Sequence, residues 1–486
     1  MLTEQRSTGR WHVLILLIYV IAILFFTYKM WFYCDRVGRF PDEMAHISYI
    51  AYLEKNPCII PDFSKMTIMT RDTIGNTTDG SIASRENFTG TFKFTGSFNY
   101  LGHPPLYYQI MRLSGGVRIV GDTVTIHIVR LRVFSMAIAL LAMLLVLYIG
   151  FSRIRGRPVL HLLYAAICVS VPMLAYDCAG INNDTLALLG VTVFILGLLR
   201  FAEKKRNTGT FLLIATGVSI AFFSKLTAGV IVLVATAIFL LITLIREKNL
   251  RFILSKRFLI TLPLYLITAA YFIAVHLQTG SFQPSFVKLE PQQFYASSFY
   301  VAPLKRTFMR FMVYFNYYAS RFVGTWTGIA SHVSLYKKGS IYSLNQIGLE
   351  SLIVLPLLLV FFRNKDRSRN TDTSVVFAVY FAIVITALTQ FLRAFYEFRY
   401  VSGYLGGFQS RYYLCGISAI ALAVVFIAQR VGGLEPYTKE KDTRPNGGIS
   451  YLMIRQVSVQ VLCVLFVALL VYEDFVYFVL HFTKYL

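Results

Sequence analysis

The chain has 486 residues, of which 56% are hydrophobic, 15% aromatic and only 15% charged. Ordinary soluble domains carry about 25% charged residues, so this composition excludes a soluble globular protein, a disordered chain and a small disulfide-rich secreted module. Lysine and arginine give a net charge of +23, which on a soluble protein would suggest nucleic acid as a partner. The composition instead indicates a polytopic membrane protein.

Apolar runs long enough to cross a bilayer recur along the chain, since a membrane helix needs about 20 apolar residues. The first run is too long for a cleaved signal peptide, and no small-residue cleavage site follows it. We therefore expect an all-α polytopic protein with about eleven transmembrane helices in a single membrane-embedded domain over residues 1–486. The expected spans are 12–33, 131–151, 159–176, 185–200, 210–224, 227–245, 258–277, 343–362, 373–392, 411–429 and 456–480.

Clusters of Lys and Arg fall in alternate loops of this arrangement. Because short cytoplasmic loops are enriched in basic residues, all these clusters lie inside if the N-terminus is cytoplasmic. Eleven spans then place the C-terminus on the extracytoplasmic side. The basic segments are the N-terminus, 152–158, 203–207, 246–257, 363–369 and 430–445.

The long connections all fall outside in this topology, at 34–130, 278–342 and 393–410. The first two are expected to carry interfacial helices, since apolar segments such as 46–54 and 104–113 are too short to span. The outer side carries more basic than acidic residues. This excess suggests an anionic partner such as a phosphate, with contact to lipid headgroups as the alternative.

The expected spans contain almost no Asp, Glu, Lys or Arg, whereas ion-coupled transporters generally need buried charges or broken helices at mid-membrane. This pattern disfavours a transporter. The sequence also contains no CxxC, HExxH or GxxxxGK[ST] motif, so a zinc site or a nucleotide-binding loop has no support. Cys34 and Cys58 share the first outer loop, but their spacing does not determine whether they pair.

The first candidate site follows the first span, in the segment RFPDEMAHISYIAYLEK. Pro41 suits the first position of a helix, and Asp42 and Glu43 would then lie in its first turn. His46 shares a helix face with this acidic pair. Two interpretations remain open here: an acidic pair that caps an interfacial helix, or a carboxylate in a half-apolar cleft that serves as a general base.

The second candidate is HPPLYY at 103–108, where two prolines stiffen the start of an interfacial helix. His103 and Tyr107 or Tyr108 could line the same site as Asp42. The alternative is a stiff turn with no further role.

The third and fourth candidates lie on short outer turns. Asn183 and Asp184 in INNDTLA offer donors and acceptors at the outer interface, although such residues also favour turns and helix starts for structural reasons. Lys225 in FFSKLTAG is the sole basic residue of its turn. Its ammonium group either extends to the lipid headgroups or binds the phosphate of a lipid substrate.

The last candidate is FRYVSGYLGGFQSRYYL at 398–414, where polar groups cluster in a glycine-rich loop. Arginine suits bidentate phosphate contacts, so Arg411 ranks first and Arg399 second among the basic candidates, with Gln409 and Tyr412 beside them. A simple interfacial anchor is the alternative for Arg411.

These segments, taken together and in this order, resemble the bacterial GT-C glycosyltransferases, a superfamily that includes protein mannosyltransferases and the lipid A aminoarabinose transferase. The resemblance extends over residues 42–413. It rests on five segments, namely the acidic pair Asp42-Glu43, HPPLYY, NNDTLA, SKLT and QSRYYL.

The resemblance implies a polyprenyl-phosphate sugar as donor, a cell-envelope glycan or lipid as acceptor, and transfer at the outer face of the cell membrane with inversion at the anomeric carbon. It assigns Asp42 as general base, with Glu43 as its neighbour or as a ligand of the acceptor. Lys225 and Arg411 would then stabilise the phosphate. His46, His103, Tyr107, Asn183, Asp184, Arg399, Gln409 and Tyr412 are expected to complete the substrate site.

Some GT-C enzymes require a divalent cation, but Asp42 and Glu43 alone would make a poor cation site, so no tightly bound metal is expected. Nucleic acid is not an expected partner. Two other functions remain as alternatives to transfer: a flippase or transporter for lipid-linked sugars, and a polysaccharide polymerase. The donor sugar, the acceptor and the oligomeric state leave no trace in the sequence.

Overall fold

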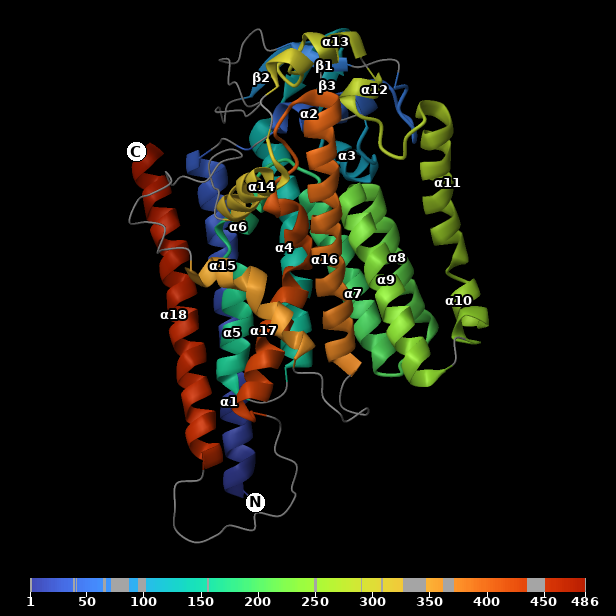
Figure 1. Cartoon of the computed structure of the whole chain (residues 1–486). Coiled ribbons are helices and arrows are strands. Elements are labelled where there is room, and N and C mark those ends of the chain that lie inside the picture. Colours follow the sequence, from blue (N-terminus) through green and yellow to red (C-terminus); the bar gives the residue numbers. More distant parts are fainter. Residues whose placement is uncertain are drawn as a thin grey trace.

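The long apolar runs form helices that lie side by side in a bundle, with short helices and a β-sheet gathered at one end (Figure 1). The protein is represented by a computed structural model. It describes residues 2–37, 40, 42–63, 67–70, 87–94, 102–154, 157–248, 251–289, 291–306, 309–326, 347–361, 371–434 and 451–485.

Within the described residues, eight helices are long and apolar enough to cross a membrane. A helix pair bent by 52° raises this number to nine if it forms one span, and two shorter apolar helices, Thr208–Ser224 and Ile347–Val360, lie at two further expected spans. This arrangement is compatible with the expected number of about eleven spans. The bundle segments are α1 (Leu2–Phe32), α4 (Ile128–Arg153), α5 (Pro158–Val169) with α6 (Pro172–Ala179), α7 (Asp184–Ala202), α8 (Thr208–Ser224), α9 (Leu226–Glu247), α11 (Leu262–Thr279), α15 (Ile347–Val354) with the 3₁₀-helix η5 (Leu355–Val360), α16 (Thr371–Tyr396), α17 (Ile417–Gly432) and α18 (Tyr451–Tyr485).

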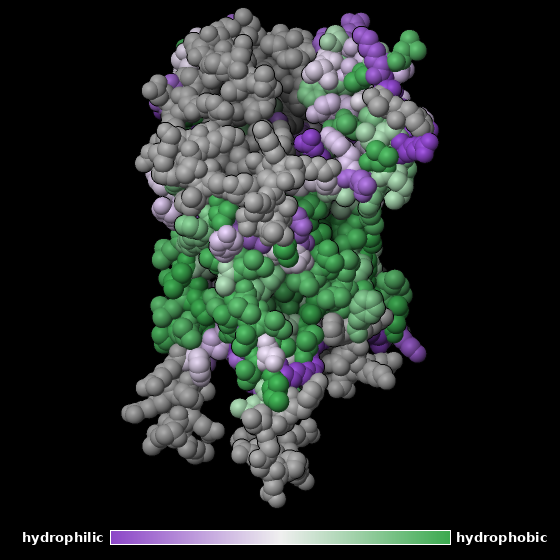
Figure 2. All heavy atoms as spheres, turned by 60° about the vertical axis from the view of Figure 1, so that its left-hand side comes forward, coloured by the Kyte–Doolittle hydropathy of each residue, from purple (hydrophilic) through white to green (hydrophobic). Residues whose placement is uncertain are grey.

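The surface of the bundle has the polarity expected of a membrane protein. On the face seen in Figure 2, hydrophobic side chains form a belt across the middle of the molecule, and hydrophilic residues are among those above and below it. Large apolar side chains such as Leu24, Leu144 and Leu266 are 64%, 49% and 58% exposed on the bundle helices. Because such a belt would be unfavourable in water, it marks the part of the protein that contacts lipid.

The third span is broken, and the break has a local cause. α5 ends at Val169 and α6 begins at Pro172, with a bend of 52° between them. Proline has no backbone N–H to continue the helix, and it restricts the residue before it to extended conformations. Val171 accordingly has φ −85° and ψ 110°. The bend directs α6 towards the end of the bundle where the short elements lie.

That end carries helices α2 (Glu43–Lys55) and α3 (Leu106–Arg112), which correspond to the two short apolar segments of the first long loop. A four-stranded antiparallel sheet of order β1-β2-β4-β3 accompanies them and was not predicted from the sequence. Its strands are β1 (Thr67–Thr70), β2 (Phe88–Phe94), β3 (Val117–Val120) and β4 (Thr123–Ile126). Val124 and Ile126 of β4 are buried in a core shared with α2 and α3, so the loop is a folded cap rather than a pair of isolated helices.

The remaining elements are short, apart from one amphipathic helix of the second long loop. They are the π-helices η1 (Tyr33–Val37) and η6 (Glu397–Ser402), the 3₁₀-helices η2 (Arg251–Leu254), η3 (Pro303–Lys305) and η7 (Ser410–Gly416), and the helices α10 (Lys256–Leu259), α12 (Phe286–Leu289), α13 (Pro291–Ala296) and α14 (Phe311–Trp326).

The spans contain buried charges, contrary to the expectation that they are nearly free of them. Lys29 of α1 donates to Asp474 of α18 at 2.7 Å and to the carbonyl of Val169. Next to Asp474, the carboxylate of Glu473 accepts the backbone N–H groups at the start of α15. An ionised group in a low-dielectric interior is tolerated when it is paired and hydrogen-bonded. These charges therefore connect helices far apart in the sequence.

Candidate functional site

A cavity of about 380 Å³ lies at the end of the bundle that carries the short elements. This volume falls within the range of roughly 300–1,000 Å³ that is typical of small-molecule sites. The cavity is lined by His46, Gly102, His103, Asn183, Asp184, Lys225, Thr227, Gln283, Pro284, Ser285, Phe286, Leu289, Gln390, Arg393, Glu397, Arg411 and Tyr412. Seven of these residues were predicted as site residues: His46, His103, Asn183, Asp184, Lys225, Arg411 and Tyr412.

Asp42 occupies an unusual backbone position directly before α2. Its φ of 61° lies in the left-handed region, which is sterically unfavourable for a residue with a side chain. Its carboxylate makes no capping hydrogen bond to α2, so the helix-capping interpretation of this residue is wrong. Instead Oδ2 accepts a hydrogen bond from Nη2 of Arg411 at 3.1 Å. Backbone strain of this kind is often associated with functional sites.

Arg411 connects the carboxylates of the site. Its guanidinium contacts Asp42 at 3.1 Å, Asp177 at 3.3 Å and Asp184 at 4.0 Å. The side chain is only 5% exposed and lines the cavity from η7. A guanidinium is suited to this arrangement because it presents several donors in one plane and stays charged when buried.

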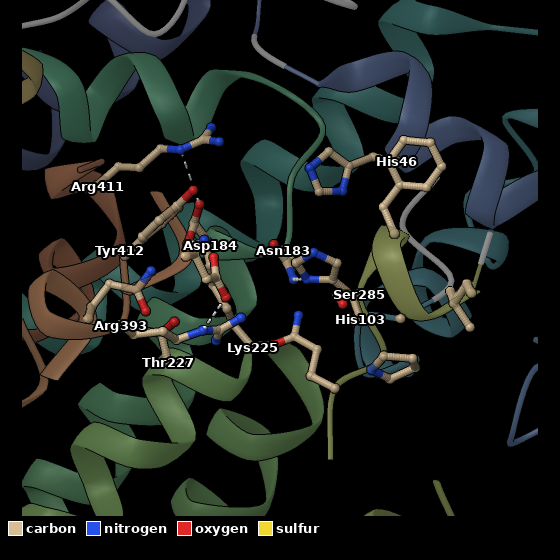
Figure 3. A pocket seen from close by; sticks show the side chains of 17 residues that line it. His46, His103, Asn183, Asp184, Lys225, Thr227, Ser285, Arg393, Arg411 and Tyr412 are labelled. Carbon is tan, nitrogen blue, oxygen red and sulfur yellow. Dashed lines mark hydrogen bonds and ion pairs between the residues drawn. The ribbon is translucent and has the colours of Figure 1, made fainter. Parts of the chain in front are cut away.

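Lys225 occupies the single extended residue between α8 and α9, where φ is −156° and ψ is 126°. This break turns its side chain away from both helices, and Nζ contacts Oδ1 of Asp184 at 2.5 Å. The ammonium also lies 4.0 Å from the centre of the Tyr412 ring, a cation–π contact. Figure 3 shows Lys225 and Asp184 between Tyr412 on one side of the cavity and His103 on the other.

The histidines lie on the opposite side of the cavity from Arg411 (Figure 3). His46 shares a hydrogen bond with the hydroxyl of Tyr108, with 3.0 Å between Nδ1 and Oη. The amide nitrogen of Asn183 lies 3.3 Å from Nδ1 of His103 and donates to the carbonyl of Ser224 at 2.7 Å. Asn183 therefore connects the start of α7 both to Ser224, the residue before Lys225, and to His103.

Burial determines the charge state of both histidines. Burial and, to a smaller extent, the nearby charge of Lys225 lower the pKa of His103 from 6.5 to about 4. Burial also lowers the pKa of His46 well below its usual value. Both rings are consequently neutral near pH 7, and each can accept a hydrogen bond.

These pKa values predict that the protein becomes less stable in mild acid. Unfolded His103 binds a proton near pH 6.5 but folded His103 only near pH 4, so its contribution to stability is complete above pH 6.5 and is lost as the pH falls towards 4. The melting temperature should drop between pH 7 and pH 5, and it should drop less in His103→Gln. Equal pH dependence in the two proteins, measured by thermal unfolding in detergent, would contradict this assignment.

Five other predicted residues are not among those that line the cavity. Asp42 is next to it through its contact with Arg411, and the other four are Glu43, Tyr107, Gln409 and Arg399. Glu43 is fully buried and paired with Arg132 of α4 through Nε at 3.0 Å and Nη2 at 2.6 Å. Its Oε1 also accepts the backbone N–H of Ile181. This position does not fit contact with an acceptor, because the carboxylate is fully buried and both of its oxygens already accept hydrogen bonds. The adjacent Asp42 and Glu43 therefore have different partners.

Tyr107 is also buried, and its hydroxyl donates to Ser135 rather than to the cavity. Gln409 is buried at the start of η7, beside the cavity-lining pair Arg411 and Tyr412, but does not itself line the cavity. Arg399 is exposed on η6, with its guanidinium 5.5 Å from the ring of Tyr400. Sequence order could not separate these residues from the cavity-lining ones, since the loop geometry decides which side chains turn inwards.

The structure adds residues that sequence analysis did not select. Asp177 reaches Arg411 because of the bend between α5 and α6, and the only signal in the sequence was its place beside INNDT on a short outer turn. Arg393 and Glu397, an ion pair at 2.9 Å near the end of α16, line the cavity together with Gln390. The segment 283–289 of the second long loop forms a further wall.

Two smaller expectations concern metal and disulfide bonds. Within the described ranges, no group of three or more His, Cys, Asp or Glu side chains is arranged to hold a metal ion. Whether the protein needs a metal stays a prediction. Cys34 and Cys58 are not linked by a disulfide.

The fold and the site define an integral membrane protein with a charged cavity at one end of its helix bundle. Residues 102–278 match the model of a family described as dolichyl-phosphate-mannose-protein mannosyltransferase. The matched range covers 177 of the 486 residues, about a third of the chain. The matched range includes three of the residues around Arg411, namely Asp177, Asp184 and Lys225.

Two solved structures are similar to the chain, both of ArnT from Cupriavidus metallidurans. The apo form has 13% sequence identity and a TM-score of 0.34, and the form bound to undecaprenyl phosphate has 14% and 0.32. Each comparison covers 93% of this chain and 85% of the other. No curated protein sequence matches the chain.

Proposed function

We propose that this protein is a GT-C glycosyltransferase that moves a sugar from a polyprenyl-phosphate donor to a hydroxyl group of a cell-envelope glycan or lipid, with inversion at the anomeric carbon. The observation that carries the proposal is the arrangement around Arg411. One buried guanidinium lines the cavity and at the same time binds the carboxylate of Asp42, the residue proposed as general base.

The charges of the cavity support an anionic donor. Its lining contains three cations, Lys225, Arg393 and Arg411, each of which also contacts a carboxylate of the site. Arginine and lysine in a low-dielectric cavity are suited to a phosphate. The description of the matched family names a dolichyl-phosphate-linked sugar, the same chemical class as the donor proposed here.

The reaction can be written with the residues of the site. Asp42 takes the proton of the acceptor hydroxyl as the acceptor oxygen attacks the anomeric carbon from the side opposite the phosphate. The bond between that carbon and the phosphate oxygen breaks, and polyprenyl phosphate leaves with the bonding electrons. Arg411 and Lys225 stabilise the negative charge that develops on the leaving phosphate.

The proposed orientation places the cavity on the extracytoplasmic side. α1 begins at the opposite end of the bundle from the cavity, and α18 ends on the cavity side (Figure 1). The basic loops lie at the end where α1 begins, because α4, α7 and α9 end there in Arg153, Ala202 and Glu247. The preference of Lys and Arg for cytoplasmic loops supports a cytoplasmic N-terminus.

The experiment that tests this function is a turnover assay on the purified protein with a panel of radiolabelled polyprenyl-phosphate sugars and candidate acceptors. Release of polyprenyl phosphate together with label on an acceptor would establish sugar transfer. Movement of the intact lipid-linked sugar across proteoliposomes without release would favour the flippase alternative. Lengthening of a glycan by whole repeat units would favour the polymerase.

Lys225→Gln should weaken donor use. A charge-assisted hydrogen bond contributes about 1.5–3 kcal/mol, so we expect kcat/KM for the donor to fall by roughly 10- to 100-fold, mainly through KM. The matched control is Lys55→Gln, which removes an exposed ion pair with Asp122 on the cap and should leave donor kinetics unchanged. An unchanged donor KM in Lys225→Gln would show that Lys225 does not bind the donor.

A further inference from the structure

Asp177 holds Arg411 from the side opposite Asp42. Nη1 of the guanidinium contacts Oδ1 of Asp177 at 3.3 Å, while Nη2 contacts Oδ2 of Asp42 at 3.1 Å. One cation is therefore shared by two carboxylates that lie 135 residues apart in the sequence. Asp184 approaches the remaining nitrogen, Nε, at 4.0 Å.

Asp177 is held in place and is less accessible than Asp42. Its side chain is 5% exposed, against 22% for Asp42, and neither carboxylate is among the residues that line the cavity. Its carbonyl accepts hydrogen bonds from the Asn182 side chain at 2.5 Å and from the backbone N–H of Gly180 at 3.3 Å. The bend after Val169 sets the direction of α6 and so the position of Asp177. Asp177 is therefore placed to influence the reaction through Arg411.

The balance of charge around Arg411 makes such an influence substantial. Three carboxylates, Asp42, Asp177 and Asp184, surround two cations, Arg411 and Lys225. A carboxylate that bound Arg411 alone would be strongly stabilised in its ionised form and would accept a proton less readily. The negative charge of Asp177 offsets part of the positive charge of Arg411, so Arg411 stabilises the ionised form of Asp42 less than it would without Asp177.

We propose that Asp177 is a positioning residue that fixes the guanidinium of Arg411 between the base and the phosphate site and so keeps Asp42 basic enough to deprotonate the acceptor. The proposal rests on the proposed function, since it takes Asp42 as the base. It assigns a role to a buried carboxylate that touches neither substrate.

Replacing Asp177 leaves the other charged and titratable residues around the two carboxylates in the sequence. The charged or titratable groups that act on Asp42 are Arg411, His46, His103, Tyr108, Tyr404 and Tyr412. Those that act on Asp177 are Arg411, Asp184, Lys225, Tyr107 and Cys178. Arg411 is the cation that both groups share and that contacts both carboxylates directly.

The test is the pH dependence of kcat/KM in Asp177→Asn, which keeps the shape of the side chain and removes its charge. When Asp177 is neutral, the positive charge of Arg411 stabilises the ionised form of Asp42 more strongly. Asp42 then stays ionised to lower pH and is a weaker base for the acceptor hydroxyl. We expect the acid limb of the profile to move to lower pH by about half a unit to one unit, and the plateau of kcat to fall by roughly 10- to 100-fold with little change in the donor KM. A merely structural role would lower the melting temperature but leave the acid limb and the kcat of folded enzyme unchanged, and that outcome would overturn the proposal.

Asp177→Glu keeps the test decisive if the asparagine variant does not fold. The longer side chain retains the charge and displaces Arg411, so the acid limb should stay at the parental pH while kcat falls; parental kcat would overturn the proposal. The matched control is Asp122→Asn, an exposed carboxylate 74% accessible on the cap, which should behave as the parent. Failure of the proposed function is recognised separately, because the parental enzyme would then release no polyprenyl phosphate and no profile would exist to compare.

Discussion

Replacing Asp42 by asparagine should abolish sugar transfer without unfolding the protein. The substitution removes the proposed base, and general base catalysis typically contributes about 10²- to 10⁴-fold to the rate. Arg411 stays paired with Asp177 and Asp184, so no buried charge is left without a partner. We expect kcat to fall by at least about a hundredfold, while the melting temperature and donor binding remain close to the parental values.

The measurement is release of radiolabelled polyprenyl phosphate by parent and variant at matched amounts of folded protein. Asp122→Asn serves as the control, because it neutralises an equally acidic side chain far from the cavity. Transfer by Asp42→Asn at the parental rate would rule out Asp42 as the base. Loss of transfer together with loss of folding would show that its contact with Arg411 is structural.

Replacing the adjacent Glu43 by glutamine should have the opposite pattern, with a large loss of stability. Glu43 and Arg132 are both fully buried, and the substitution removes the negative charge that Glu43 places against the Arg132 guanidinium in a low-dielectric interior. Breaking a buried ion pair by removing one partner costs about 3–5 kcal/mol. We therefore expect a marked drop in melting temperature and in the yield of folded protein, with the remaining folded fraction still active.

Thermal unfolding of Glu43→Gln, Arg132→Gln and the double variant separates these contributions. The double variant should lose less stability than the sum of the two single variants, because it leaves neither charge isolated. A stable but inactive Glu43→Gln protein would instead show that Glu43 takes part in catalysis. The two neighbouring substitutions thus distinguish a catalytic carboxylate from a structural one.

The sequence alone determined the membrane architecture of this protein. Apolar length is a local property, so the eleven expected spans coincide with helices or bent helix pairs between α1 and α18. Local chemistry also indicated the break at Lys225 and the helical segments of the first long loop. The polar segments between the expected spans supplied seven of the side chains that line the cavity, because such segments must lie at the membrane surface.

Only the tertiary structure decided which of these residues act together. Asp42 and Glu43 are adjacent acidic residues, yet their carboxylates have different partners. Asp42 has a left-handed backbone and contacts Arg411, whereas Glu43 is packed against Arg132. Asp177 reaches the same guanidinium only because α6 bends away from α5. The partners in these pairs lie 89 to 369 residues apart in the chain. Such contacts depend on how whole helices pack, and no local pattern in the sequence encodes that packing.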